Sequence, residues 1–198
     1  MADYTAIRLV SQALKTLLEQ HITLSSDPDL KNVPIHLYSP KEMHEQNLTL
    51  GVSLWLYQVD RFDEMLNNPP PFRAPGEQER PALPVNLHYL ITPIAQMPAD
   101  AQVLIGRVLQ TLNDHSALRG AELDPALTGP GLDYGIRNIL RTPTLEELTR
   151  TWHALHEPYR LSVNYLVQMV QINSDHLPVA SSPVRQQRSE YVQILEAT

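Results

Sequence analysis

The 198-residue sequence contains no cysteine, which excludes disulfide bonds, thiolate-bound metal centres and a cysteine nucleophile. Lysine is scarce too, with only Lys15, Lys31 and Lys41, and the formal net charge is −7. Nonspecific nucleic-acid binding needs clustered cationic side chains that displace counterions. We therefore expect no nucleic-acid partner.

Long apolar runs are also missing. No run approaches the ~20 apolar residues of a membrane-spanning helix, and the first twenty residues include Asp3 and Glu19 without a signal-peptide core. The length suits one domain, which at this size buries about 70% of the surface of its unfolded chain. These features predict cytoplasmic synthesis and no membrane contact.

Glycine is rare, with 7 residues against 17 prolines. Six prolines fall between Asn67 and Pro84. Because proline lacks a backbone donor and disfavours helix in the residue before it, residues 67–84 are predicted to form an extended loop. A loop of this length is either a solvated linker between two strands or a contact surface.

The most regular pattern runs from Leu83 to Pro93 and predicts a half-buried strand bracketed by Pro84 and Pro93. With a period of two, one face carries Val85, Leu87, Tyr89 and Ile91, and the other carries Asn86, His88 and Thr92.

Four further strands are predicted. They are Pro34–Tyr38, a central Gly51–Val59 with two apolar faces, Gly135–Arg141, and the longest strand, which follows Pro158. In this last strand the second face turns apolar from Leu166 to Ile172. Either a helix of the same chain or a partner chain would cover that face.

Three helices are predicted from apolar residues at helical spacing. The first covers Tyr4–His21 with Asp3 as N-cap, and the second begins at Pro98 and ends near His115. The third begins with a Thr144–Glu147 capping box, and its inner face is expected to hold Leu145, Leu148, Trp152 and Leu155.

The order of these elements predicts an α+β fold: a single domain with a mostly antiparallel (mixed) sheet packed by about three helices. We assign residues 1–173 to this domain. Residues 174–198 form a polar tail that ends in an apolar patch around Tyr191, Val192, Ile194 and Leu195.

No motif predicts catalysis. His153 and His156 lack the spacing of zinc peptidase ligands, and as cations they would complement a helix C-terminus. There is no G-x-S-x-G nucleophile turn and no glycine-rich loop with a lysine. We predict no catalytic, cofactor-binding or metal-binding residue.

Six segments in order carry a family resemblance across most of residues 4–173. They are Ser53–Val59 with Asn67–Pro70, Arg80–Pro93, Gly106–Gln110, Asn113–His115, Leu145–Leu148 and Pro158–Tyr165. With these segments the chain resembles cap or tail-terminator proteins of extracellular contractile injection systems, of the antifeeding-prophage type.

This resemblance implies a tail-terminator-like fold and a non-enzymatic hexameric ring. Such a ring would bind the terminal sheath and tube proteins and stop their polymerisation, in a phage tail-like particle that is released from the cell. Two other functions stay open: a phage-like neck or tail-completion protein, and a monomeric soluble adaptor.

Two segments are candidate assembly contacts. Phe72 and Arg73 lie at the tip of the proline-rich loop, whose stiffness reduces the entropy lost on binding. Tyr191, Val192 and Ile194 belong to a tail segment, Glu190–Leu195, that could add a strand to a neighbouring sheet. Alternatively, either segment is a surface stretch without a partner.

Overall fold

The computed structural model describes residues 3–65, 72–74, 77–78, 80–123, 125–127, 135–176 and 179–180. Within these ranges the main sheet has six strands. Their spatial order is β1 (Ile35–His36), β2 (Gly51–Arg61), β5 (Leu83–Ile94), β8 (Val163–Ile172), β7 (Ile136–Arg141) and β6 (Ala117–Leu118).

Only β1 and β2 run parallel in this sheet, and every other neighbouring pair is antiparallel. The predicted α+β fold with a mixed, mostly antiparallel sheet is confirmed. The division of the chain at residue 173 stays a prediction.

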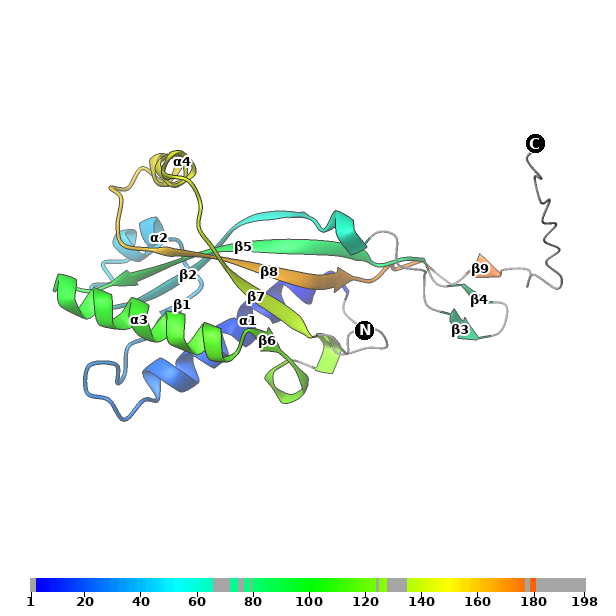
Figure 1. The fold of residues 1–198 in the computed structure, drawn as a ribbon, viewed down its shortest axis with the longest axis horizontal. Helices are drawn as coiled ribbons and strands as arrows, with labels where there is room; N and C mark the ends of the chain where they lie inside the picture. Colours follow the sequence, from blue (N-terminus) through cyan, green and yellow to red (C-terminus); the bar gives the residue numbers. More distant parts are fainter. Residues whose placement is uncertain are drawn as a thin grey trace, which may run out of the picture.

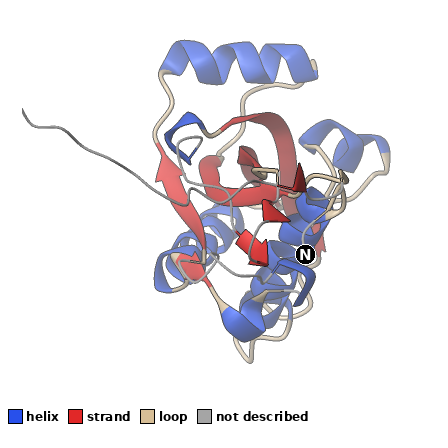
Figure 2. Cartoon of the chain, turned by 90° about the vertical axis from the view of Figure 1, so that its right-hand side faces the viewer, coloured by secondary structure: helices blue, strands red, loops and turns tan. Residues whose placement is uncertain are grey.

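Helices cover both faces of the sheet (Figures 1 and 2). On one face lie α1 (Ala6–Leu18), which continues into a π-helical turn, η1 (Glu19–Thr23), and α3 (Pro98–Asp114). On the opposite face lies α4 (Leu145–Leu155). A fourth helix, α2 (Pro40–Glu45), was not predicted, and three short 3-10 turns complete the described elements: η2 (Asp63–Met65), η3 (Gly120–Glu122) and η4 (Pro125–Leu127).

The helix ends largely follow the sequence. At α4 the Thr144–Glu147 capping box is confirmed, since Glu147 N–H donates to Thr144 Oγ1 at 3.2 Å and Thr144 N–H donates to Glu147 Oε2 at 2.8 Å. Asp3 does not cap α1 directly, because its carboxylate accepts the Thr5 N–H at 2.8 Å, in the turn before the helix.

The main core lies between the sheet and the two helices α1 and α3. It contains the predicted inner residues of β5 (Val85, Leu87, Tyr89 and Ile91), together with Leu104, Val108 and Leu112 of α3. The other face of β5 is more buried than predicted, because α4 places Trp152 and Leu155 over Leu90. Leu145, expected on the inner face of α4, is instead 77% exposed.

Two β-bulges make the strands of the structure differ from the predicted strands. One lies in β2 at Tyr57, between the pairs Leu56–Tyr89 and Gln58–His88. The other lies in β8, where Met169 adopts a φ of 68° and the pairing shifts by one residue.

The bulge at Met169 changes the face of every later residue in β8. Val170 joins the same core as Val163 and Val167, and Ile172 packs against it. The end of β8 is therefore not apolar on both faces, and the core that contains α1 covers these side chains. The strand also begins later than predicted, at Val163, and β5 rather than β8 is the longest strand, with Pro84 and Pro93 inside it.

Candidate assembly interface

A second, small sheet pairs strands of the proline-rich segment with a short strand near the C-terminus. Its order is β3 (Phe72–Ala74), β4 (Glu77–Gln78) and β9 (Val179–Ala180), and both pairings are antiparallel. Glu77 pairs with Ala180 and Gln78 with Val179, so the C-terminal segment joins the proline-rich segment. In Figure 1 this sheet lies beyond the ends of β5 and β8, away from the helices that cover the main sheet.

The predicted contact residues divide between the described and undescribed parts of the chain. Phe72 and Arg73 lie on β3, where the structure describes the backbone. Tyr191, Val192 and Ile194 lie outside the described residues, in the segment that follows β9. The role of all five residues in assembly stays a prediction.

A polar cluster on the α4 side of the sheet was not predicted. His88 on β5 is 5% exposed, and its Nε2 lies 2.7 Å from Asp60 Oδ2 on β2. Its Nδ1 lies 3.2 Å from a guanidinium nitrogen of Arg141 on β7. The cluster therefore links three strands, although Asp60 and Arg141 are far from His88 in the sequence.

Hydrogen bonding fixes the role of each nitrogen in this cluster. Arginine can only donate, so Nδ1 of His88 accepts from Arg141 and Nε2–H donates to Asp60. The imidazole is neutral in this arrangement. Among the described residues, no Ser, Thr or Tyr hydroxyl is hydrogen-bonded to this imidazole.

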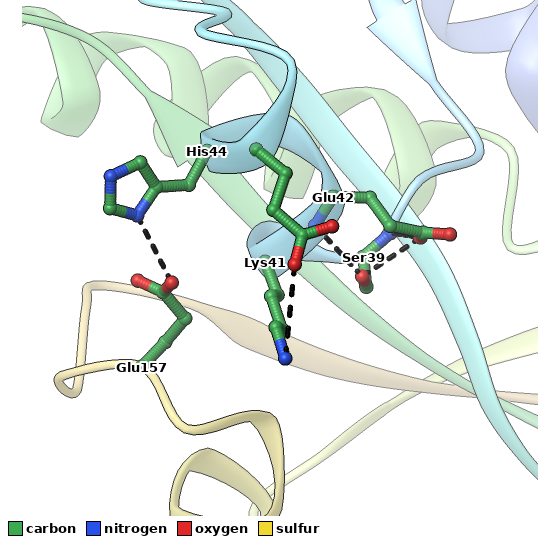
Figure 3. Close-up of polar contacts among 6 residues, drawn as sticks. Ser39, Lys41, Glu42, His44 and Glu157 are labelled. Atoms are coloured by element: carbon green, nitrogen blue, oxygen red, sulfur yellow. Dashed lines mark hydrogen bonds and ion pairs between the residues drawn. The ribbon is translucent and has the colours of Figure 1, made fainter.

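A second contact joins α2 to the turn after α4 (Figure 3). His44 Nδ1 lies 3.0 Å from Glu157 Oε1, and the Glu157 side chain is 10% exposed against 67% for His44. Helix α2 is fixed at its start by a capping box, in which Glu42 N–H donates to Ser39 Oγ at 3.2 Å and Ser39 N–H donates to Glu42 Oε2 at 2.7 Å. Lys41 and Glu45 form an exposed pair at 3.8 Å.

Four of the other histidines lie in two ring pairs. His21 and His115 lie with ring centroids 5.0 Å apart, and burial lowers the pKa of His21. His153 and His156 are 6.3 Å apart by the same measure. Within the described part of the chain, no three His, Cys, Asp or Glu side chains group closely enough to hold a metal ion. In the same residues, no helix has the length and apolar character needed to cross a membrane.

Solved structures share this fold. A cryo-EM structure of the sheath/tube terminator of a PVC extracellular contractile injection system, in the extended state, superimposes with a TM-score of 0.67 at 22% sequence identity. That match covers 100% of this chain and 67% of the other chain. The tube-terminating cap of the anti-feeding prophage gives a TM-score of 0.63 at 21% identity, over 92% of this chain and 60% of the cap. A comparison with curated proteins gives no significant match.

The architecture therefore places the chain in the fold class of contractile-injection-system terminators, as the sequence resemblance implied. A family profile described as the Pvc16 N-terminal domain matches residues 9–186. The chain belongs to this family.

Proposed function

We propose that this chain is a cap protein that binds the end of a contractile injection system tail and stops the polymerisation of tube and sheath. The observation that carries the proposal is the fold match over the whole chain to a sheath/tube terminator, together with the family membership. The chain spans 67% and 60% of the length of the two matched proteins.

The proposed working form is a homo-hexameric ring. A sixfold ring made by head-to-tail contacts closes without a free edge, and it can therefore complement the last tube or sheath layer and leave no site for another. The proposed partners are copies of the same chain and the terminal sheath and tube proteins. The chain would be made in the cytoplasm and then become part of a released particle.

The small sheet is the proposed contact region. It combines the segment that carries Phe72 and Arg73 with the strand that precedes Tyr191, Val192 and Ile194. Because β4 pairs with both β3 and β9, a partner that binds here would contact both segments. The function needs no catalytic residue or cofactor, since it depends on shape and on the closing of a ring.

The test is particle assembly with and without this protein. In its absence we expect tails of variable length in negative-stain images, and re-expression of the wild-type chain should restore a uniform length. Tails of unchanged length and intact ends in the absence of the protein would contradict the proposal.

The contact region is tested with the double variant Phe72→Ala, Arg73→Ala. We expect an unchanged circular-dichroism spectrum and weaker ring formation by light scattering. Leu24→Ala is a suitable control, because Leu24 is 75% exposed and lies far from this sheet in the sequence. Equal ring formation by both variants would remove Phe72 and Arg73 from the interface.

A further inference from the structure

Among the described strands, one edge of the main sheet is unpaired along most of its length. The register of β1 with β2 covers only Val52 and Ser53. From Leu56 to Arg61, β2 pairs with β5 on one side, and no described strand pairs with it on the other. An edge strand of this length presents unpaired N–H and C=O groups that can accept another strand.

The backbone direction along this edge follows from two hydrogen bonds. Val52 N–H donates to Pro34 O on the β1 side, and Phe62 N–H donates to Pro84 O on the β5 side. The backbone N–H and C=O groups of successive residues in a strand point to alternate sides. Those of Asp60 therefore also point toward β5, whereas those of Val59 and Arg61 point away from it, toward the open edge.

The side chains of this edge are partly exposed. Val59 is 44% exposed, and Arg61 and Gln58 are exposed. The bulge at Tyr57 interrupts the regular repeat of the edge, which disfavours pairing with an arbitrary strand. Directly after β2, Asp63 and Glu64 are exposed and acidic.

We propose that this edge accepts residues Glu190–Leu195 of a neighbouring copy as an antiparallel strand. This inference rests on the proposed ring and names its contact. The segment Glu190–Leu195 has the same length, six residues, as the open edge Leu56–Arg61, and it is rich in strand-forming residues (Tyr191, Val192 and Ile194).

The charges beside the two segments favour an antiparallel over a parallel orientation of the docked strand. Arg185 and Arg188 precede the docking segment in the sequence. An antiparallel strand brings its beginning to the end of β2, so these arginines arrive beside Asp63 and Glu64. A parallel strand would carry them to the opposite end of β2.

The chain can make this connection. β9 ends at Ala180, and the nine residues from 181 to 189 span about 30 Å when extended. Each copy then carries one donor segment and one acceptor edge. Such a contact is heterologous, the type that closes a ring.

Cross-linking between two copies of the chain tests the proposal. Because the sequence contains no cysteine, an introduced cysteine is the one thiol in each variant. Two full-length variants, Val59→Cys and Val192→Cys, are co-expressed with tags of different mass and treated with a short thiol-to-thiol cross-linker. We expect a cross-linked pair that contains one copy of each variant. Val103→Cys replaces Val59→Cys in the control, because Val103 is also a valine, is 43% exposed and lies on α3.

Two results would overturn the proposal. One is a cross-link to Val192→Cys that is no stronger from position 59 than from position 103. The other is a cross-link within one chain when Val59→Cys and Val192→Cys are combined, since that would show the tail docked on its own sheet.

Blocking the edge separates this inference from the proposed function. Val59→Pro removes an outward N–H and should abolish ring formation with the fold intact, whereas Val59→Thr keeps the N–H and should form rings. If Val59→Pro forms rings that still end tails at normal length, the acceptor edge is wrong and the terminator function stands. If the wild-type chain neither forms rings nor affects tail length, the proposed function fails.

Discussion

At the scale of single residues, the core contains a buried polar pair between α1 and β5. Ser11 Oγ lies 2.7 Å from the Tyr89 hydroxyl, and Tyr89 is fully buried. Burial raises the pKa of Tyr89 to about 12 from an ordinary value of 10.0, although the hydrogen bond with Ser11 acts in the opposite direction. The protonated phenol is therefore the form that the folded chain requires.

This pKa predicts a loss of stability in alkali. Because Tyr89 loses its proton at lower pH in the unfolded chain than in the folded chain, its contribution is complete below pH 10 and decreases between pH 10 and about 12. A shift of this size corresponds to about 2–3 kcal/mol. Urea titrations across this range should show a shallower decline for Tyr89→Phe than for the wild type. Parallel curves would contradict the prediction.

His88 is the second residue whose removal we expect to matter. His88→Ala removes a buried imidazole and its two hydrogen bonds, to Asp60 and to Arg141, and at about 0.5–1.5 kcal/mol for each hydrogen bond the loss is about 1–3 kcal/mol. The free energy of unfolding in urea should decrease by this amount. The control is Arg150→Ala, which breaks the pair of Arg150 with Glu146, whose side chains are 79% and 73% exposed, and should change stability by less than about 0.5 kcal/mol. Equal effects of the two variants would contradict a structural role for His88.

The sequence could not have revealed the His88 cluster. Its three residues lie on β2, β5 and β7, and only the register of the folded sheet brings them together. His88 was placed correctly on the polar side of its strand, but the pattern of one strand contains no information about the strands beside it. By contrast, the Ser39–Glu42 capping box of α2, which we did not predict, is a local signal in the sequence, because the two residues lie three positions apart with Pro40 between them.

At the scale of elements, α4 is attached to the sheet by few buried side chains. Trp152 is 2% exposed and packs with Leu155 against Leu90, with Trp55 and Tyr57 at the margin. Trp152→Ala should therefore cost about 3–5 kcal/mol in urea unfolding. Leu145→Ala on the same helix should cost far less, because Leu145 is 77% exposed. A loss below 1 kcal/mol for Trp152→Ala would show that α4 is not held by this contact.

Periodicity predicted the three longer helices, the longer strands of the main sheet and the core face of β5, since that face follows a regular spacing. It failed where the backbone departs from that spacing. The bulges at Tyr57 and Met169 each add one residue, and no residue type in their neighbourhood announces them. The apparent second apolar face at the end of β8 was the result of reading a bulged strand with an uninterrupted period of two.

At the scale of the whole molecule, the structure separates a packed body from the small sheet that is the proposed contact region. The body is closed by α1 and α3 on one face and α4 on the other, while β3, β4 and β9 lie beyond the strand ends (Figure 1). Among the described residues, the main core includes none from β9, and we expect removal of the tail to leave the body folded.

Deletion of residues 182–198 tests this separation. We expect the shortened chain to keep the circular-dichroism spectrum and the urea midpoint of the full chain, because the described core lies entirely before the cut. Its mass by light scattering should decrease from that of six subunits toward that of one, since the deletion removes the proposed donor segment. Replacing residues 182–198 with a Gly-Ser segment of the same length controls for chain length and should give the same result. Normal hexamers from the shortened chain would show that the tail has no part in closing the ring.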